Sequence, residues 1–338
     1  MRAVVLVGGF GTRLRPLTLG LPKQMLTVGR VTMLERVVEH LGASGVDEVV
    51  LSLGYQPDAF LDEFPDGTCA GVRLSYAVEP EPLDTAGAIA FAARHVGVDE
   101  RFIAVNGDVL TDLDVADLWA CHERFGGSAT IALTPVEDPS RFGVVPLDAE
   151  GRVEAFIEKP DPGTAPSNWI NAGTYVLEPE VLDLVPGGRK VSIEREVFPA
   201  LVERGGLYGV QSESYWIDAG TPEAYLQAHL DLVDGVRPGL GAGIDPSARI
   251  DGSAKVHRSV LGQGVVVAAG AHVEDSVLLD GARVSAGAVV RRSIVGGRAV
   301  VGEASDLSDL TVVGFDEDVP PGTVASGGRF PGPETWGG

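Results

Sequence analysis

The feature that most restricts the fold lies in the last third of the chain, where apolar residues recur at every sixth position. The two series are Ile244, Ile250 and Val256, and then Val260, Val266, Leu278, Val284 and Val290, the second interrupted at His272. A six-residue period fits neither a helix nor an alternating strand, but it is typical of a parallel β-helix, in which each side of a coil buries one aliphatic residue. We therefore expect a β-helix domain of the left-handed, hexapeptide-repeat kind over residues 244–326.

Residues 1–233 follow a different pattern, in which short apolar runs alternate with helical ones. The expected strands are 3–7, 48–53, 73–78, 102–106, 129–134 and 153–157, and the expected helices are 33–42, 85–95, 114–125, 193–203 and 222–233. Such alternation predicts an α/β domain, a Rossmann-like and mostly parallel sheet covered by helices on both faces. A linker rich in Gly and Pro is expected at 234–243, and residues 327–338 are expected to form a loose tail.

The charge of the chain limits its partners. Its 338 residues include 26 Lys and Arg against 48 Asp and Glu, which gives a formal net charge of −22. This charge argues against a surface that binds nucleic acid or an anionic membrane, so phosphate-bearing ligands must be held by a few local cations. Only four lysines occur, and two of them, Lys23 and Lys159, lie in motifs considered below.

Cysteine usage and the first residues point to the cytoplasm. Two cysteines, Cys69 and Cys121, suffice for neither a disulfide framework nor a tetrahedral zinc site, so we expect reduced thiols. The five apolar residues 3–7 are too few for the apolar region of a signal peptide, and no apolar run is long enough to span a membrane.

The first expected strand leads into a glycine-rich loop, GGFGTRLRP (residues 8–16). Glycines directly after a strand let backbone N–H groups approach a phosphate, and a following helix would add a favourable dipole. The loop is not a Walker A motif, because no Gly-Lys-Ser/Thr is present, and Leu14 stands where a dinucleotide fingerprint needs its third glycine. It supplies Arg13 and, ten residues further on, Lys23.

These residues resemble a known family. GGFGTRLRPLT followed by PK is similar to the signature of the sugar nucleotidyltransferases, and the likeness continues through EPLDTAGAI, NGD, FGVV, EKP, NAG and WIDAGTPEAYLQAH. It covers most of residues 1–233. VEDPSRFGVV, SIEREVFPAL and the length of the β-helical region are most similar to the members that make GDP-mannose from mannose 1-phosphate and GTP.

The resemblance implies in-line attack of a sugar 1-phosphate on the α-phosphorus of a nucleoside triphosphate, with release of pyrophosphate. The attacking phosphate oxygen is already anionic near neutral pH, so no general base is required. The lack of a Ser/His/Asp or Cys/His constellation is therefore expected, and the site needs cations and Mg²⁺ instead.

The resemblance also assigns roles to individual residues. Two carboxylates at the ends of separate strands, Asp108 and Asp218, are expected to hold the Mg²⁺. Arg13, Lys23 and Asp108 are the expected catalytic residues. The expected nucleotide contacts are Leu6, Gly8, Gly9, Gly11, Thr12, Arg13, Lys23, Glu79, Glu81, Pro82, Asp84 and Thr85. The expected sugar-phosphate contacts are Asp108, Gly143, Glu158, Lys159 and Asn171.

The choice of base is expected to rest on Leu6, Gly8, Gly9 and the segment EPEPLDTAG (residues 79–87). Guanine presents two adjacent donors that one carboxylate can accept together, whereas uracil and thymine suit an amide better, so a glutamate at 79 or 81 favours guanine. One departure from the family pattern is Asp84, where a glycine is common. A glycine would admit close backbone approach to the nucleotide, whereas Asp84 adds a charged side chain or caps the helix that follows.

Other interpretations stay open. A glucose 1-phosphate uridylyl-, thymidylyl- or adenylyltransferase would use the same loop, and a non-catalytic, nucleotide-sugar-binding paralogue would keep the same fold. An additional acyltransferase activity is disfavoured, because the β-helical region is short and holds only His257 and His272 as histidines. Because the open end of a β-helix must be capped or paired, we expect a homo-oligomer.

Overall fold

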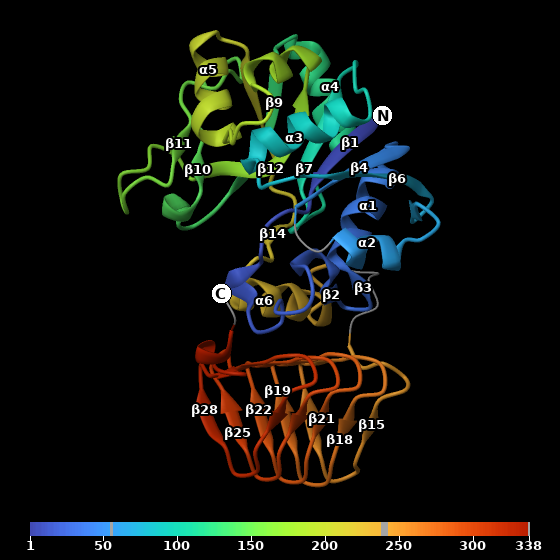
Figure 1. Ribbon diagram of the computed structural model, residues 1–338. Coiled ribbons are helices and arrows are strands. Elements are labelled where there is room, and N and C mark those ends of the chain that lie inside the picture. The colour runs from blue at the N-terminus through green and yellow to red at the C-terminus, as the bar shows by residue number, and fades with distance from the viewer. Residues whose placement is uncertain (55–56, 238–242, 337–338) are drawn as a thin grey trace. The chain divides into compact units, whose positions relative to one another are not determined.

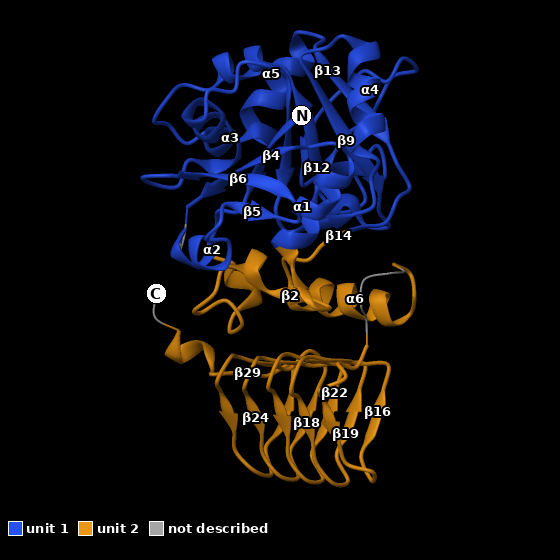
Figure 2. Cartoon of the chain, turned by 90° about the vertical axis from the view of Figure 1, so that its right-hand side faces the viewer, with its two compact units in different colours: residues 1–9, 34–216 blue, residues 10–33, 217–338 orange. Residues whose placement is uncertain are grey.

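The structure is a computed structural model (Figure 1) that describes residues 1–54, 57–237 and 243–336. The chain divides into two compact units, which Figure 2 colours separately. The first comprises Met1–Gly9 and Leu34–Trp216, and the second comprises Phe10–Met33 and Ile217–Gly338. The glycine-rich loop is therefore divided, since its first glycines belong to the first unit and Gly11, Arg13 and Lys23 to the second.

Within the described residues, the first unit is built on a ten-stranded mixed sheet. Its strands are β1 (Arg2–Leu6), β4 (Glu48–Leu53), β5 (Thr68–Cys69), β6 (Val72–Val78), β7 (Phe102–Asn106), β9 (Ala129–Pro135), β10 (Gly143–Val144), β11 (Ile157–Glu158), β12 (Trp169–Leu177) and β13 (Leu207–Gln211). The order is β11-β10-β12-β7-β1-β4-β6-β5, with β9 between β12 and β13. Strands β7, β1, β4 and β6 are parallel, as are β9 and β13, whereas β12 is antiparallel to both its long neighbours. The predicted, mostly parallel α/β domain is confirmed.

The central strands are buried, as their aliphatic sequences predict. Val4, Val50 and Ala104, on neighbouring strands, are almost fully buried and share one cluster with the alanines of α3 (Asp84–His95). Small side chains on α3 let the helix lie close to the sheet. The other helices are α1 (Met33–Ala43), α2 (Pro57–Glu63), α4 (Val115–Phe125), α5 (Phe198–Glu203) and, in the second unit, α6 (Pro222–Val233).

Most of the predicted elements are present, with two differences. The strand predicted at 153–157 is wrong, because Val153 makes only an isolated bridge with Leu147 and β11 does not begin until Ile157. Val153 and Phe156 still pack in the core, so they produced a strand-like apolar pattern in an irregular segment. The helix predicted at 193–203 starts as a π-helical turn, Ile193–Val197, before α5.

The second unit contains a parallel β-helix, whose strands stack in three parallel sheets of five strands each among the described residues. One sheet is β15 (Arg249–Ile250), β18 (Val266–Val267), β21 (Arg283–Val284), β24 (Val300–Val301) and β27 (Asp318–Val319). The next is β16 (Lys255–His257), β19 (His272–Glu274), β22 (Val289–Arg291), β25 (Asp306–Ser308) and β28 (Val324–Ser326). The third, here called the third sheet, is β17 (Val260–Leu261), β20 (Val277–Leu278), β23 (Ile294–Val295), β26 (Val312–Val313) and β29 (Arg329–Phe330).

The length of the coils shows that the predicted six-residue period is not strictly kept. Val260 pairs with Val277, so one coil takes 17 residues rather than 18, and one side of each such coil is a residue short. The inward position therefore moves: Val267 is 1% exposed and Val273 is fully buried, whereas Val266 is half-buried. This shift explains why His272 interrupts the predicted series, since the neighbouring Val273 fills the core instead.

The ends of the β-helix differ from the expected boundaries. β29 pairs with β26, so the coil ladder extends past residue 326 into the segment expected as a loose tail. Residues 238–242 of the expected linker lie outside the described residues. Cys69 and Cys121 are buried free thiols. No described helix has the length and hydropathy of a membrane-spanning segment.

Candidate active site

The NGD motif lies where β7 ends beside β1, in the first unit. Leu6 and Asn106 are register partners on these parallel strands, and the Gly107 amide donates to the Leu6 carbonyl at 2.9 Å. A Cβ on Gly107 would lie 2.8 Å from that oxygen, so only glycine fits this crossing. The motif thus brings Asp108 to the carboxyl edge of the parallel strands, where ligands of open α/β sheets bind.

Glu79 holds the turn that was expected to read the base. Its side chain is buried, and its two carboxylate oxygens accept from the Ser52 hydroxyl at 2.9 Å and the Leu83 amide at 3.1 Å. A Cβ on Gly8 would lie 3.8 Å from the same carboxylate. Glu79 therefore fixes the turn beside Gly8, whereas Glu81 is exposed on that turn.

The start of α3 explains the unusual Asp84. Its φ of 62° lies in the left-handed region, where glycine is favoured and Asp is tolerated better than most residues. Its carboxylate accepts from the Thr85 amide at 2.8 Å, an amide of the first helical turn. The Thr85 hydroxyl in turn donates to Glu194 and accepts from the Ile193 amide, both at 2.8 Å. The Asp84 carboxylate thus accepts a hydrogen bond at the start of α3, and the Thr85 hydroxyl connects α3 to the π-helical turn by two hydrogen bonds.

Two of the expected sugar contacts, Gly143 and Glu158, are register partners on β10 and β11. A Cβ on Gly143 would meet the Phe156 ring at 2.5 Å and the Glu158 carboxylate at 3.2 Å, so glycine is required there. Lys159 has a φ of 49°, and its Nζ lies 3.4 Å from a Glu158 carboxylate oxygen. Its side chain is 61% exposed, so the ammonium is accessible to a ligand phosphate.

Asn171 shapes a bulge in β12. Its side-chain oxygen accepts from the Gly173 amide and its Nδ2 donates to the Tyr175 hydroxyl, both at 2.9 Å. The bulge turns Gly173 to a φ of 75° and so close to Asn106 that a Cβ would lie 2.7 Å from the Asn106 Nδ2. The NAG and NGD motifs therefore fit against one another. Sequence reasoning missed Asn106 as a contributor, although it lies within the quoted NGD motif.

Segment 10–33, in the second unit, carries the expected phosphate-binding cations. The helix that was expected to follow the loop is absent there: the segment continues into the short 3-10 turns η1 (Thr12–Leu14) and η2 (Lys23–Met25). The Thr18 hydroxyl donates to the Gly11 carbonyl at 2.8 Å, and a Cβ on Gly11 would lie 3.3 Å from Lys23 Cβ. The loop is therefore folded tightly on itself, and Arg13 is exposed.

Two further polar residues of this segment were not singled out from the sequence. Gln24 is completely buried, and neither its side-chain oxygen nor its nitrogen has a hydrogen-bond partner among the residues that the structure describes. The buried Nε of Arg15 likewise has none. A buried polar group without a partner destabilises a fold by about 1–3 kcal/mol. We call Arg13, Arg15, Lys23 and Gln24 the loop-side group, and Glu79, Thr85, Asp108, Glu158, Lys159 and Asn171 the sheet-side group.

The two residues expected as Mg²⁺ ligands belong to different units. Asp108 follows β7 in the first unit, and Asp218 ends β14 (Trp216–Asp218) in the second, where it accepts from the Gly220 amide at 2.9 Å. No cluster of three or more His, Cys, Asp or Glu in the described part of the chain could hold a metal ion. A pair of carboxylates fits a hard cation that keeps its waters and takes its remaining ligands from phosphates, which is how Mg²⁺ binds in nucleotide sites.

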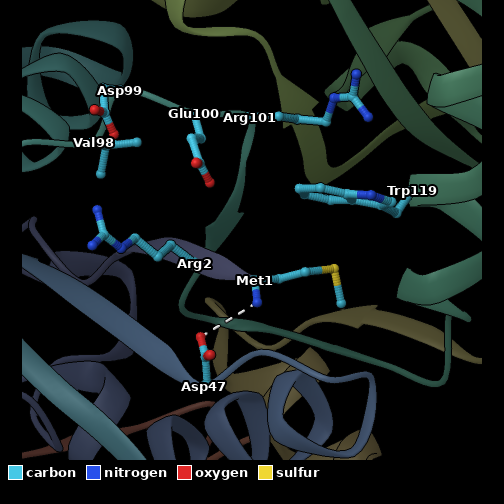
Figure 3. Close-up of a pocket in the computed structure, with 8 residues that line it drawn as sticks. All are labelled: Met1, Arg2, Asp47, Val98, Asp99, Glu100, Arg101 and Trp119. Atoms are coloured by element: carbon cyan, nitrogen blue, oxygen red, sulfur yellow. Dashed lines mark hydrogen bonds and ion pairs between the residues drawn. The ribbon is translucent and has the colours of Figure 1, made fainter.

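A separate pocket of about 390 Å³ (Figure 3) lies at the other edge of the sheet. It is lined by residues that precede or begin strands, including Arg2, Asp47 and Arg101. Arg101 is bonded to Glu178 and Glu123 and lies over the Trp119 ring. Since ligands of such sheets bind at the carboxyl ends of strands, this pocket is not the candidate active site.

Comparison with known proteins identifies the family. Residues 2–235 match the sequence model of the nucleotidyl transferase family. The chain belongs to this family. Residues 241–329 match a second model, described as the GMPPB C-terminal domain.

Two named relatives of this family member extend over most of its length. A mannose-1-phosphate guanylyltransferase of Mycobacterium tuberculosis (strain ATCC 25618 / H37Rv) is 41% identical over 82% of this chain and 80% of the relative. A mannose-1-phosphate guanyltransferase of Schizosaccharomyces pombe (strain 972 / ATCC 24843) is 38% identical over 98% of this chain and 95% of the relative.

Solved structures match about two thirds of the chain. HddC from Yersinia pseudotuberculosis superposes with a TM-score of 0.59 at 30% identity, over 67% of this chain and 97% of that one. It has also been crystallised with GMP-PN. A putative glucose-1-phosphate thymidylyltransferase from Bacillus anthracis gives a TM-score of 0.62 at 25% identity, over 68% of this chain and 93% of that one.

Proposed function

We propose that this nucleotidyl transferase joins mannose 1-phosphate to GTP and releases pyrophosphate, with GDP-mannose as the product. The observation that carries the proposal is that relatives 38–41% identical over 82–98% of this chain are named for this reaction. The phosphate loop, the NGD carboxylate and the exposed lysine of EKP supply the chemistry that such a reaction needs.

In this proposal Glu81 reads the base. A single carboxylate accepts the two adjacent donors of guanine, the ring N–H and the amino group. Both oxygens of Glu79 are engaged by Ser52 and Leu83, so Glu79 supports the turn while the exposed Glu81 contacts guanine. Leu6, Gly8, Gly9 and Pro82 would flank the base and ribose.

Catalysis rests on position and on neutralisation of negative charge. Arg13 binds the departing pyrophosphate, Lys23 binds near the α-phosphate, and backbone amides around Gly11 and Thr12 contact the triphosphate. The sugar's phosphate oxygen then attacks the α-phosphorus opposite the leaving group, without a general base. Asp108 and Asp218 would hold Mg²⁺, which when bound neutralises and orients the phosphate oxygens.

The sugar phosphate is bound by the other residues of the sheet-side group. Lys159 binds its phosphate, and Glu158 accepts hydrogen bonds from sugar hydroxyls beside the bare backbone of Gly143. Asn171 uses one amide hydrogen and one lone pair within the protein, which leaves one of each for the sugar.

We further propose that the protein works in the cytoplasm as a homo-oligomer, without nucleic acid or membrane partners. The net charge of −22 supports the exclusion of anionic partners, and the exposed ends of the coil stack support self-association.

The reaction is tested by pyrophosphate release with Mg²⁺, crossing GTP, UTP, dTTP, ATP and CTP with mannose 1-phosphate and glucose 1-phosphate. We expect GTP with mannose 1-phosphate to give by far the highest kcat/KM. A strong signal with another pair would keep the chemistry and reject the substrates. Nucleotide binding without turnover for every pair would instead indicate a regulatory paralogue.

The role of Glu81 is tested by Glu81→Gln, with Glu79→Gln as its matched control. We expect Glu81→Gln to reduce discrimination between GTP and UTP by about tenfold or more, because one good bidentate contact contributes about 1–3 kcal/mol to base discrimination. Glu79→Gln should lower the free energy of unfolding and keep the preference for GTP. Unchanged preference in Glu81→Gln would reject the assignment.

A further inference from the structure

Segment 10–33 belongs to the compact unit that contains the β-helix, although in sequence it directly follows the first strand of the sheet. It carries Arg13 and Lys23, the two cations proposed for the triphosphate. Figure 2 shows β2 (Thr27–Val28) of this segment and α6 in one layer that runs alongside the coils of the β-helix. The phosphate-binding loop and the coils of the β-helix therefore belong to one compact unit, in which the coils can affect the conformation of the loop.

One side of the β-helix is apolar on its outer surface. In the third sheet, Leu261, Leu278, Val295 and Val313 fill the interior of the coils. Their neighbours Val260, Val277, Ile294 and Val312 form the adjacent register column and point outward. These outward side chains are nevertheless at most 4% exposed. By contrast, Val324 at the edge of another sheet is 81% exposed, so the third sheet is covered and its outward aliphatic side chains form an internal interface.

Contacts within the second unit show what lies against this sheet. Helix α6 contacts β17, and a Cβ on Gly314, directly after β26, would lie 3.3 Å from Pro16 Cβ. Pro16 is buried and lies three residues after Arg13. The loop therefore rests on the last coils at Pro16, and a side chain on Gly314 would press on Pro16 as well as on the Phe330 carbonyl, which would lie 3.2 Å from the Cβ.

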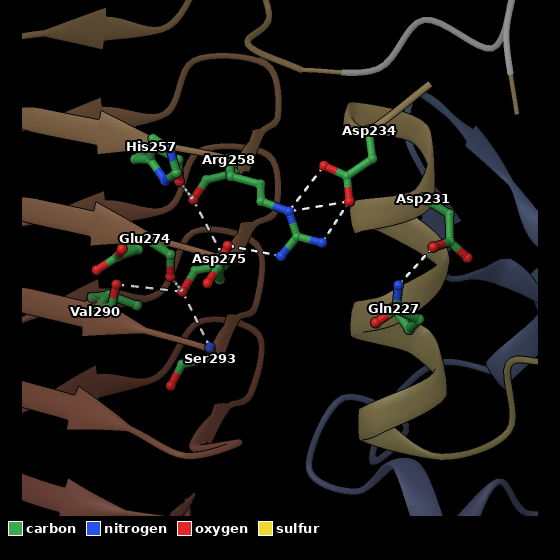
Figure 4. Close-up of polar contacts among 11 residues, drawn as sticks. Gln227, Asp231, Asp234, His257, Arg258, Glu274, Asp275, Val290 and Ser293 are labelled. Atoms are coloured by element: carbon green, nitrogen blue, oxygen red, sulfur yellow. Dashed lines mark hydrogen bonds and ion pairs between the residues drawn. The ribbon is translucent and has the colours of Figure 1, made fainter. Parts of the chain in front are cut away.

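The other end of the segment is fixed through α6 and the first coils. The Thr27 carbonyl accepts from the Tyr225 hydroxyl and contacts His229 Nε2 at 3.0 Å. Arg30 lies 3.7 Å from Asp245, which precedes the first strand of the β-helix. Helix α6 is itself connected to the coils through Arg258 (Figure 4).

Arg258 joins the end of α6 to two coils. Its Nε donates to Asp234, directly after α6, at 2.9 Å, and its Nη1 donates to Asp275 of the next coil at 2.9 Å. The hydrogen bond from Arg258 lowers the pKa of Asp234. The carboxylate therefore stays ionised until the pH falls below its ordinary range near 4, and the connection persists at neutral pH.

We propose that the β-helix is the platform that sets the conformation of the phosphate-binding loop, with Gly314 as a positioning residue. The inference rests on the proposed function for the identity of the ligand, because Arg13 and Lys23 are taken as its phosphate contacts. Small displacements of groups that bind a reacting phosphate reduce catalysis steeply. A coil stack that contacts Pro16 directly and holds Thr27 through α6 therefore acts on nucleotide binding without touching the nucleotide.

The test compares Gly314→Ala and Gly314→Val with Gly252→Val, which places the same side chain on the β-helix where a Cβ would have no neighbour within 4 Å. We expect Gly314→Val to raise the KM for GTP by about tenfold or more, Gly314→Ala to raise it less, and Gly252→Val to leave it unchanged. The KM for mannose 1-phosphate should change by less than about twofold, because its proposed contacts lie in the first unit. Equal effects on both substrates, or none, would overturn the proposal.

A second measurement does not depend on turnover or on folding of the variants. In the wild-type protein, saturating GTP should slow hydrogen exchange at the amides of Val312 and Gly314, because a ligand that orders the loop also stabilises what the loop rests on. Mannose 1-phosphate alone should leave these amides unchanged. Protection of segment 10–33 by GTP without protection of Val312 and Gly314 would contradict the platform. Absence of any GTP effect on segment 10–33 would contradict the proposed function instead.

Discussion

The sheet-side and loop-side groups are held in opposite ways. In the sheet-side group, Glu79, Thr85 and Asn171 each make two hydrogen bonds within the first unit. In the loop-side group, the side-chain amide of Gln24 and the Nε of Arg15 are buried without hydrogen-bond partners in the described part of the chain. The two groups of motif residues therefore differ: Glu79, Thr85 and Asn171 fix local structure within the first unit, whereas Gln24 and Arg15 keep buried hydrogen-bonding capacity in the second.

The glycines show the same division. Those of the sheet side, Gly107, Gly143 and Gly173, lie where a Cβ would collide with a neighbouring backbone or side chain. Because they have no side chain, these glycines permit neighbouring strands and motifs to pack in direct contact. Gly9, at the start of the loop, has a φ of 102° and nothing within 4 Å of a Cβ, so its role is conformational and the space beside it is open. This contrast predicts which substitutions change stability and which change activity.

The largest effect is expected for Asp108→Asn, which removes a proposed Mg²⁺ ligand while keeping the size of the side chain. We expect kcat/KM to fall by about a thousandfold, as for loss of a key electrostatic contact in other enzymes. The free energy of unfolding is measured in parallel, so that loss of the metal contact is separated from loss of folded protein. Pyrophosphate release and urea denaturation measure the two quantities, and a loss of activity below about tenfold would remove Asp108 from the metal site.

Gly107→Ala tests the close contact between NGD and β1. The added methyl group would overlap the Leu6 carbonyl, so we expect a loss of about 1–3 kcal/mol in the free energy of unfolding together with reduced activity. Gly187→Ala is the matched control in the same unit, since a Cβ there has no neighbour within 4 Å. Equal stability of the two variants would show that the crossing tolerates a side chain.

Lys159→Ala separates the two substrates on the sheet side. The Lys159 side chain is exposed, and among the described residues it forms an ion pair with Glu158, so stability should be unchanged. We expect the KM for mannose 1-phosphate to rise by about tenfold or more, because one charge-assisted hydrogen bond is lost. The KM for GTP should change less. Equal losses for both substrates would reject the assignment of Lys159 to the sugar phosphate.

The smallest effect is expected for Gln24→Met, which replaces a buried, unpartnered amide by an apolar side chain of similar length. We expect the free energy of unfolding to rise by about 1 kcal/mol and activity to fall, because the amide beside Lys23 is retained at a cost to stability. Thermal and urea denaturation, with turnover measured in parallel, check both parts. Higher stability with full activity would show that Gln24 has no functional role.

The sequence was most informative where a pattern repeats or a motif is long. The alternation of strands and helices predicted the α/β domain, and the apolar period predicted the β-helix. Its phase was wrong by one residue at Val266, because a 17-residue coil does not divide into equal sides of six. Strand β12 escaped prediction because the bulge between Asn171 and Tyr175 interrupts its alternation.

For the candidate site, single motifs identified the candidate residues. They did not show which residues support the local structure and which are available to a ligand. The sequence offered Glu79 and Glu81 as equal candidates for the base, and only the bonds from Ser52 and Leu83 separate them. Asp84 looked like an obstacle to the nucleotide, whereas its left-handed backbone explains why glycine is common at this position. The burial of Gln24 could not be predicted, because its polar side chain in a turn has no periodic pattern.

The most direct test of the central claim is the reverse reaction. GDP-mannose and pyrophosphate are incubated with the enzyme and Mg²⁺, and ³¹P NMR follows the products. We predict formation of GTP and mannose 1-phosphate in equal amounts, dependent on Mg²⁺ and absent in Asp108→Asn. Failure to form GTP from GDP-mannose, while another nucleotide sugar yields its triphosphate, would contradict the account.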